Sequence, residues 1–190
     1  LAGTLHTTIN GTPYLRAYTD GSCTDGTHRE KSRAGWGVYY APAHPGNCTS
    51  RLQVPVQTSY RAEVYAVLHV ARTAVEHTLI HTDCLNVAKT LSDYLLHGKA
   101  QGKPPAETDL WLQIYHHVDT NAKDLIRIKW IPSHLDEESK AAAKRKYIRD
   151  GVCTEEDILG NVHADKLANL GREQHEDITS LLQLSEDRVN

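Results

Sequence analysis

Apolar side chains in the first sixty residues occur in short runs rather than at helical spacing. The runs 13–19, 34–41 and 51–57 predict three strands, the second of them rich in aromatic and β-branched residues. A turn-forming segment at 42–50 separates the last two runs. Pro55 assigns the third strand to a sheet edge, because proline cannot donate a ladder hydrogen bond. The pattern therefore predicts an antiparallel meander.

From residue 60 onward the apolar positions change to helical spacing. The segment 60–76 predicts a helix with one apolar face, formed by Val64, Val67, Leu68, Ala71 and Val75. The same spacing argument predicts a strand over 78–82, a helix from Leu85 to near Gly98, a break over 99–106, a helix over 107–120 and a strand over 124–131.

The C-terminal third is highly charged. Residues 138–149 predict an exposed helix, and Asn161 is expected to cap a last helix that carries apolar residues as far as Leu170. Residues 1–12 form an expected leader, 13–177 a single domain, and 178–190 a poorly packed C-terminal tail.

The order of these elements predicts the fold class. Three sequential strands followed by alternating helices and strands indicate an α/β protein. We expect one mixed sheet of five strands, three antiparallel and then two parallel, with helices on both faces.

Composition narrows the class of protein. A net charge of −3 argues against a basic nucleic-acid coat protein, though not against an enzyme with a local basic patch. No apolar run is long enough to cross a bilayer, so no membrane partner is expected. Four scattered cysteines without metal-binding spacing are expected to be free thiols in an intracellular protein, cytoplasmic or nuclear. The absence of a start methionine, with no methionine elsewhere, suggests a domain cut from a longer chain or a processed protein.

Four acidic residues stand where strands end or helices begin: Asp20, Glu63, Asp83 and Asp165. Each alone is more often a cap, a turn former or a partner of the helix dipole. If the strands that precede Asp20 and Asp83 are neighbours, however, the two carboxylates share one crevice at the carboxyl edge of the sheet. Clustered carboxylates repel one another, and a hard divalent cation such as Mg²⁺ relieves that repulsion.

Five short strings occur in the order of the five motifs of type 1 ribonuclease H, and the chain resembles that family. They are YTDGS at 18–22, QTSYRAEVYAV at 57–67, HTDC at 81–84, WIPSH at 130–134 and GNVHADKLA at 160–168. The resemblance implies a ribonuclease H-like fold over roughly residues 13–175.

The resemblance also implies the site chemistry. Asp20, Glu63, Asp83 and Asp165 would bind two Mg²⁺ ions, for which Mn²⁺ can substitute. His134 would assist product release or proton transfer beside them. Without the resemblance, His134 would be read as an exposed loop histidine.

Substrate contacts are expected at the first helix and just after the first acid. Thr58, Ser59 and Tyr60 match a family segment that contacts a phosphate and the minor groove, and Tyr60 could equally pack on a sugar or cap the helix. Gly21 and Ser22 are expected to contact substrate as well.

The stretch between His134 and Asp165 is longer than in compact family members, which implies an insertion at about 136–159. It is rich in cations, among them Lys144 and Arg145. We weigh two interpretations: a grip on the phosphate backbone, or a solvated helix with Glu/Lys pairs.

The expected function is endonucleolytic hydrolysis of the RNA strand of an RNA–DNA hybrid, leaving 5′-phosphate and 3′-hydroxyl ends. The rivals are a catalytically silent nucleic-acid-binding module and a DDE-type transposase or integrase of the same fold. The chain also suits a domain of a retrotransposon polyprotein, covalently linked to a reverse transcriptase, as well as a stand-alone enzyme.

Overall fold

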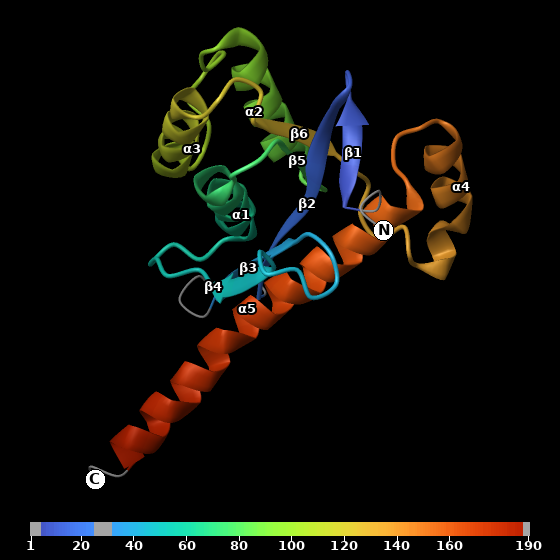
Figure 1. Ribbon diagram of the computed structural model, residues 1–190. Coiled ribbons are helices and arrows are strands. Elements are labelled where there is room, and N and C mark those ends of the chain that lie inside the picture. The colour runs from blue at the N-terminus through green and yellow to red at the C-terminus, as the bar shows by residue number, and fades with distance from the viewer. Residues whose placement is uncertain (1–4, 25–31, 188–190) are drawn as a thin grey trace.

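A mixed sheet runs through the centre of the molecule (Figure 1). The structure, a computed structural model, describes residues 5–24 and 32–187, with side chains up to residue 175. Within these residues six strands form the sheet: β1 (His6–Ile9), β2 (Thr12–Cys23), β3 (Ala34–Tyr39), β4 (Cys48–Arg51), β5 (Thr78–Thr82) and β6 (Ile126–Trp130). Their order is β4-β3-β2-β5-β6, with β1 paired to β2. The β4-β3-β2 pairs are antiparallel and the β2-β5-β6 pairs parallel, which confirms the predicted mixed sheet.

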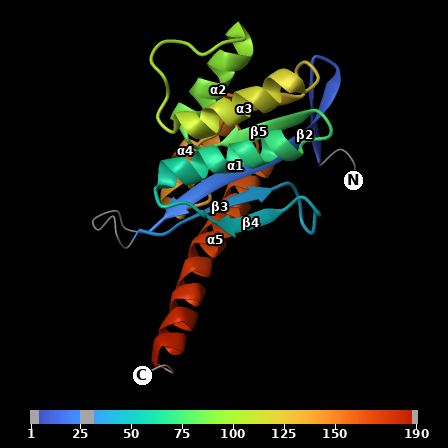
Figure 2. The same ribbon diagram turned by 90° about the vertical axis from the view of Figure 1, so that its left-hand side faces the viewer.

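Helices cover both faces of the sheet, as predicted. They are α1 (Ser59–Thr73), α2 (Leu85–His97), α3 (Thr108–Thr120), α4 (Ala141–Arg149), preceded by the short 3-10 helix η3 (Glu138–Lys140), and α5 (Glu155–Asp187). Figure 2 shows α1 and α3 on one side of the strands and α5 on the other. Among the described residues, none of these helices combines the length and apolar character needed to span a membrane.

Glycines allow two helices to approach the sheet from opposite sides. A Cβ added to Gly21 of β2 would lie 2.5 Å from the backbone nitrogen of Glu63 in α1. A Cβ added to Gly37 of β3 would lie 2.6 Å from the Cβ of Leu167 in α5. Side chains at these positions would push the helices outward, so the glycines set how closely α1 and α5 pack on the strands.

The first strands differ from the prediction at two places. Residues 6–9 of the expected leader form β1, because β3 pairs only with the second half of β2 and leaves its first half open to another strand. The third strand was predicted over 51–57, but β4 ends at Arg51. Beyond it the chain is a loop, which the side-chain amide of Gln57 holds through a 2.7 Å hydrogen bond to the Leu52 carbonyl.

Most helix predictions are confirmed, but their ends differ. Strand 78–82 and the helix that ends at Gly98 occur as expected, and Gly98 has the left-handed φ of 70° that suits a C-cap glycine. Helix α1 ends at Thr73, so Val75 does not join its apolar face and is 92% exposed. Residues 25–31, between β2 and β3, lie outside the described part.

The last helix begins earlier than predicted. Helix α5 starts at Glu155, and Asn161 lies inside it rather than at its cap. Thr154 caps the helix: its hydroxyl accepts from Asp157 N at 3.1 Å, and the Asp157 carboxylate accepts from Thr154 N at 3.0 Å. The backbone of the expected tail is helical through Asp187, and Figure 1 shows these last turns extending beyond the sheet.

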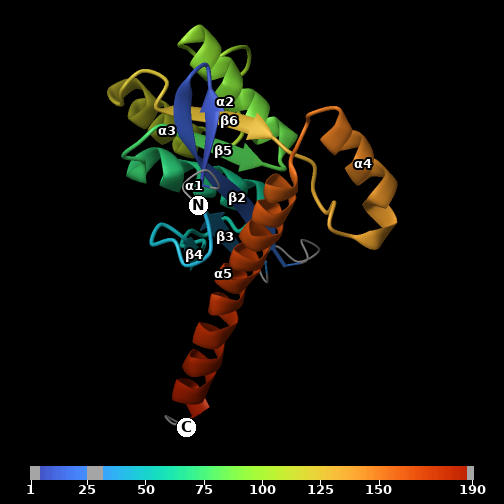
Figure 3. The same cartoon turned by 45° about the vertical axis from the view of Figure 1, so that its right-hand side comes forward.

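The predicted insertion is folded rather than loose. Helix α4 stands to one side of the first turns of α5 (Figure 3). Its predicted exposure holds for one face only, because Ala143, Tyr147 and Ile148 pack against a buried cluster. That cluster consists of Tyr18, Ile131, Leu135, Cys153, Ile158 and Ala164.

Candidate active site

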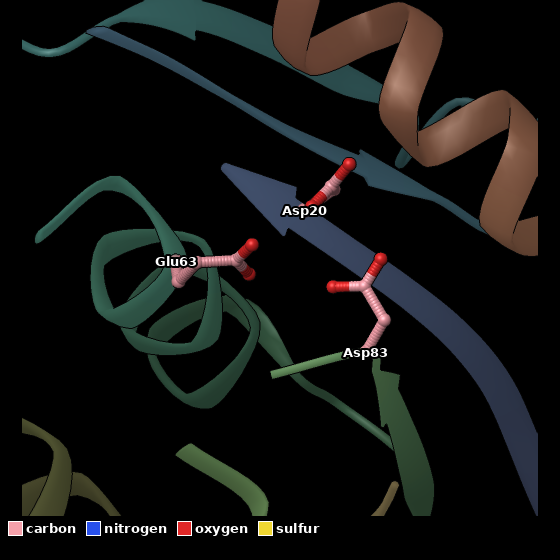
Figure 4. A group of neighbouring side chains, drawn as sticks. All are labelled: Asp20, Glu63 and Asp83. Carbon is pink, nitrogen blue, oxygen red and sulfur yellow. The ribbon is translucent and has the colours of Figure 1, made fainter. Parts of the chain in front are cut away.

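Three carboxylates meet at the carboxyl edge of the parallel strands. Strands β2 and β5 are neighbours, and Thr19 is paired with Thr82, so the next residues, Asp20 and Asp83, lie side by side. Glu63 points toward them from α1 (Figure 4). One carboxylate oxygen from each of the three residues lies within 4.8 Å of the others. The condition set by the sequence, that the two strands be neighbours, is therefore met.

The exact positions of these acids differ slightly from the prediction. Asp20 does not end its strand, because β2 continues to Cys23. Glu63 lies just beyond the first turn of α1, which begins at Ser59. Both shifts leave the carboxylates buried: Asp20 is 5% exposed and Glu63 is 7% exposed.

Burial and mutual repulsion disfavour the charged forms of these acids. Burial raises the pKa of Glu63 to about 8, and the Asp83 carboxylate adds to the rise. Burial, together with the charges of Glu63 and Asp83, raises the pKa of Asp20 well above its usual value. Burial also raises the pKa of Asp83. Without a cation the cluster therefore retains protons near neutral pH.

One buried oxygen in the cluster lacks a partner. The Oε2 atom of Glu63 has no hydrogen-bond donor within the described part of the chain, although it is shielded from solvent. Such an atom costs free energy unless a donor or a cation satisfies it. An all-oxygen set of three carboxylates is also the donor chemistry that hard divalent cations prefer. The residues present therefore fit a divalent metal ion.

Asp165 lies beside this group but outside its compact core. It is half-buried and three turns into α5, rather than near the helix start as predicted. Its carboxyl group helps to raise the pKa of Asp20, and its charge raises the pKa of Asp83. The structure thus brings all four predicted acids together, with three of them closest.

A row of polar residues on α5, each four positions from the next, faces the strands. Asp157, Asn161, Asp165 and Asn169 share one helix face, because four residues make slightly more than one turn. Asn161 is 6% exposed and its amide donates to Asp83 Oδ2 at 3.2 Å. This hydrogen bond lowers the pKa of Asp83 and fixes its carboxylate.

Asn161 is a site residue that sequence reasoning missed. The prediction of a helix cap at this position is wrong, although Asn161 stands four residues before Asp165 in the GNVHADKLA string. That helical spacing was the signal that placed both side chains on one face. Asp83 is held from a second direction as well, since the indole nitrogen of Trp130 donates to its carbonyl at 3.2 Å.

Asp157 anchors the start of the row in the protein interior. The hydroxyl of Tyr18 donates to Asp157 Oδ1 at 2.8 Å, and His81 Nε2 lies 3.4 Å from the same oxygen. All three side chains are buried. Because Tyr18 belongs to β2 and His81 to β5, these contacts fix α5 against the two strands that carry Asp20 and Asp83.

His134 is exposed at the rim of the site. Its side chain is 60% exposed, and Nδ1 lies 3.4 Å from Glu137 Oε1. Its backbone has a left-handed φ of 58°, which is uncommon for a residue with a side chain. The histidine lowers the pKa of Asp83, so it approaches the acidic cluster from this rim.

Two predicted substrate residues at α1 are engaged within the protein. Thr58 caps the helix, its hydroxyl accepting from Arg61 N at 3.1 Å. The Tyr60 hydroxyl donates to Asn86 Oδ1 at 2.8 Å and accepts from the Trp111 indole at 3.4 Å. Ser59 is exposed at the helix start.

The predicted contacts after Asp20 also have structural partners. Gly21 allows α1 to approach β2, as described above. The Ser22 hydroxyl donates to Asn169 Oδ1 at 2.7 Å and accepts from Arg172 at 2.9 Å. Neither Asn169 nor Arg172 belongs to a recognised motif, since both lie on α5 beyond the acidic string that ends at residue 168.

The two predicted substrate-binding cations of the insertion, Lys144 and Arg145, differ in their surroundings. The Lys144 ammonium lies 3.1 Å from Glu155 Oε2 and is only 33% exposed. Arg145 is exposed, as is Lys146. The Lys144 pair agrees with the solvated-helix interpretation, whereas the exposed pair leaves a cationic surface on α4.

Known proteins resemble this chain over most of its length. The model of the RNase H family matches residues 13–173. Ribonuclease H1 of Homo sapiens is 26% identical over 168 residues, covering 86% of this chain and 52% of the relative. Ribonuclease H1 of Mus musculus is 27% identical over 170 residues, covering 84% and 50%. The chain thus spans about half the length of these curated relatives.

Two solved structures from prototype foamy virus share the fold. Its RNase H domain aligns with a TM-score of 0.58 at 22% identity, covering 83% of this chain and 93% of that one. Its protease–reverse transcriptase aligns with a TM-score of 0.57 at 24% identity, covering 83% of this chain and 20% of that one.

Proposed function

Because the chain belongs to the ribonuclease H family, we propose that it hydrolyses the RNA strand of RNA–DNA hybrids as an endonuclease. The cleavage would leave 5′-phosphate and 3′-hydroxyl ends. The observation that carries the proposal is the buried group of Asp20, Glu63 and Asp83, with its unpartnered Glu63 oxygen. Burying three carboxyls together destabilises the fold, and a binding module without catalysis would not require such a cluster.

The proposed cofactor is Mg²⁺, as two ions, with Mn²⁺ as a substitute. Asp20, Glu63 and Asp83 would hold the metal, and Asp165 would complete the set from α5. When bound, the metal supplies Lewis-acid activation of water and of the phosphodiester. The raised pKa values of the carboxyls support this choice, because a divalent cation replaces the protons that they otherwise retain.

The remaining residues of the site orient these groups and move protons. Asn161 holds the Asp83 carboxylate in one rotamer, which preserves the ligand geometry. His134, exposed at the rim, is proposed to carry a proton to or from the reacting phosphate or to speed release of the product.

Selectivity for RNA is proposed to arise from recognition of 2′-hydroxyl groups, which distinguish RNA from DNA. Ser59 is the best placed of the predicted contacts, since its side chain is exposed at the start of α1. Thr58, Tyr60, Gly21 and Ser22 contribute mainly by shaping this surface, because the contacts described above already engage them.

Hydrolysis of a labelled hybrid with Mg²⁺ tests the proposal. We expect wild-type cleavage of the RNA strand only, and a fall on the order of 1,000-fold for Asp20→Asn, since the metal contributes several kcal/mol to the transition state. Asp124→Asn is the matched control, because Asp124 is an exposed acid at the start of the β6 segment and its left-handed φ of 59° suits asparagine.

Three outcomes would contradict the proposal. Equal cleavage of double-stranded DNA would refute RNA selectivity. Strand transfer without hydrolysis would favour the transposase alternative. An absence of Mg²⁺ binding in calorimetry, together with an absence of cleavage, would favour the silent module.

Covalent linkage to a reverse transcriptase is a separate proposal. The fold likeness to a domain within the foamy-virus protease–reverse transcriptase supports it, because that domain occupies about a fifth of a longer chain. The sequence of the gene on both sides of this chain tests it: an adjoining polymerase sequence is expected, and its absence would favour a stand-alone enzyme.

A further inference from the structure

Strand β6 forms one border of the sheet (Figure 3). Within the described part of the chain, β5 is its only strand partner. The Thr78 nitrogen donates to the Leu125 carbonyl at 2.8 Å. The Ile131 nitrogen donates to the Thr82 carbonyl at 2.9 Å. Because the backbone groups of successive residues in a strand point in opposite directions, the odd-numbered residues of β6 face β5 and the even-numbered residues face outward.

The outward residues are Ile126, Ile128 and Trp130. Their backbone N–H and C=O groups have no hydrogen-bond partner within the described part of the chain. A sheet border of this kind is a template for a further strand, because a strand from another chain can pair with the unused backbone groups. The border is five residues long, which suits a short extended segment.

An apolar groove of about 290 Å³ follows this border on the side of α2. Leu95 and Leu96 of α2 line it, together with Ile126 and Ile128 of β6. Leu96 is 78% exposed, although it is a large apolar residue. Since side chains alternate along a strand, every second residue of an added strand would point toward this groove and contact Leu96.

Two cations alternate with the isoleucines on the opposite face of β6. The side chains of Arg127 and Lys129 are each 38% exposed. The Arg127 guanidinium donates to the Tyr14 hydroxyl at 3.1 Å and lies 3.8 Å from Asp124 Oδ2. The Lys129 ammonium lies 4.0 Å from Asp157 Oδ2. Both ion pairs are longer than the roughly 2.8 Å of a charge-assisted hydrogen bond, so acidic residues on an added strand would supply closer partners.

The same cations disfavour a second copy of this chain as the added strand. A symmetric dimer would pair the two β6 strands antiparallel, with their even-numbered residues opposite one another. Every register that pairs two or more of these residues places Arg127 or Lys129 opposite a basic residue of the other copy. Like charges directly opposite each other are destabilising. The favoured occupant is therefore a segment of another protein, apolar on one face and acidic on the other.

We propose that the outer edge of β6 is a docking site for an extended protein segment in which apolar and acidic residues alternate. The backbone of the segment pairs with the outward groups of β6. Its apolar side chains enter the groove beside α2, and its acidic side chains lie opposite Arg127 and Lys129. The inference concerns a protein partner and does not depend on hydrolysis of a hybrid.

NMR of the isotope-labelled full chain tests the site, with a soluble peptide of alternating valine and glutamate as the probe. On addition of the peptide, the backbone amides of Ile126, Ile128 and Trp130 should become protected from hydrogen exchange by about tenfold. The amides of Arg127 and Lys129 should gain little protection, because they already bond to β5.

Two N-methylated versions of the peptide distinguish strand addition from simple charge attraction. The methyl groups replace the N–H hydrogens that face β6 in one version, and those that face away from β6 in the other. Only one version should therefore lose binding. A valine–lysine peptide should bind about tenfold more weakly than the valine–glutamate peptide, since its cations would lie opposite Arg127 and Lys129.

Leu96→Ser tests the groove, and Leu112→Ser is its matched control. Leu112 is 61% exposed on α3 and does not line the groove. Leu96→Ser should weaken peptide binding about tenfold, since the contact with the exposed leucine is lost, and Leu112→Ser should leave it unchanged. The double variant Arg127→Gln/Lys129→Gln should weaken binding of the valine–glutamate peptide about fivefold. Thermal unfolding checks the fold of each variant.

Several outcomes would overturn the proposal. They are an absence of peptide binding, equal effects of the two N-methylation patterns, and equal effects of Leu96→Ser and Leu112→Ser. Protection of the β6 amides by an RNA–DNA hybrid but not by the peptide would identify the edge as a nucleic-acid surface instead. None of these measurements uses cleavage, so failure of the docking site and failure of the proposed function are distinguishable.

Discussion

The two sides of the candidate active site are built in different ways. Asp20, Glu63 and Asp83 come from segments close to a fixed backbone pairing, since β2 and β5 pair directly and Gly21 brings α1 onto β2. Asn161 and Asp165 come from a helix of 33 residues that crosses the opposite face of the sheet. His134 comes from an exposed turn.

This difference teaches what holds each side in place. Strand pairing fixes the positions of Asp20 and Asp83 relative to each other, because a register shift of one residue would turn every side chain of the strand to the other face of the sheet. The second side depends on the rotation and the axial position of α5, which the buried Asp157 contacts with Tyr18 and His81 determine. Perturbations of the two sides should therefore differ in kind.

The largest effect should come from the carboxylates in the absence of metal. Because burial raises the folded-state pKa of Glu63 to about 8, the folded protein keeps a proton that the unfolded chain releases near pH 4.5. Stability is then present at low pH and is lost as pH rises from about 5 to 8, by roughly 3 kcal/mol. Urea unfolding in EDTA at several pH values measures this loss.

The matched variant for that measurement is Glu63→Gln, which removes one of the three interacting carboxyls and should make the pH dependence shallower, since Asp20 and Asp83 keep raised pKa values. Adding Mg²⁺ to the wild type should restore stability at high pH, since a ligand of the folded state stabilises it. A metal-free wild type with the same profile as Glu63→Gln would contradict the coupling of these carboxyls.

A smaller effect should follow from loosening the second side. Asn161→Ala removes the amide that holds Asp83, and we expect about 30-fold lower kcat/KM at limiting Mg²⁺, partly recovered at high Mg²⁺. Titration of activity with Mg²⁺ measures it. Asn121→Ala is the control, since within the described part of the chain its side-chain amide donates to the Ala71 carbonyl at 3.4 Å and to none of the acids of the site. Unchanged metal dependence would show that Asn161 does not orient a ligand.

His134 should matter less than the residues that hold the metal. His134→Asn removes the imidazole while retaining a residue that tolerates the left-handed φ of 58°. We expect about a tenfold fall in kcat, less than for a buried general acid, with unchanged Mg²⁺ dependence. Single-turnover and steady-state rates distinguish chemistry from product release. A shift in the Mg²⁺ requirement would instead place His134 with the ligand-holding residues.

The smallest effect is expected at α4. The double variant Arg145→Ala/Lys146→Ala removes two exposed cations of α4 and leaves the Lys144–Glu155 ion pair intact. About threefold weaker hybrid binding, with a salt slope reduced by up to two, would support the grip interpretation. Lys123→Ala, an exposed lysine before β6, is the control. An unchanged slope would establish the solvated-helix interpretation.

Much of the fold could be predicted because local pattern and tertiary structure agree. Strand β5 and helix α2 occur where the spacing placed them, since their apolar periodicity matches their burial. The strand predicted over 51–57 is wrong, because the two valines around Pro55 resemble a strand pattern, whereas the Gln57 side chain stabilises a loop there. Strand β1 was not predicted, because its HTTI sequence has little apolar pattern. Its position depends instead on pairing with β2.

The sequence by itself identified Asp20, Glu63 and Asp83, because each lies in a string that matches a family motif, but it left open whether the strands before Asp20 and Asp83 are neighbours. Only the tertiary structure decided how α5 completes the site. Its start at Glu155 depends on the Thr154 cap, and its position depends on Asp157 contacts with residues more than 70 positions earlier in the chain. Such long-range contacts leave no periodic signal along the chain. The spacing of Asn161 and Asp165 places both on one helix face, but only the packing of α5 against the sheet makes Asn161 a partner of Asp83.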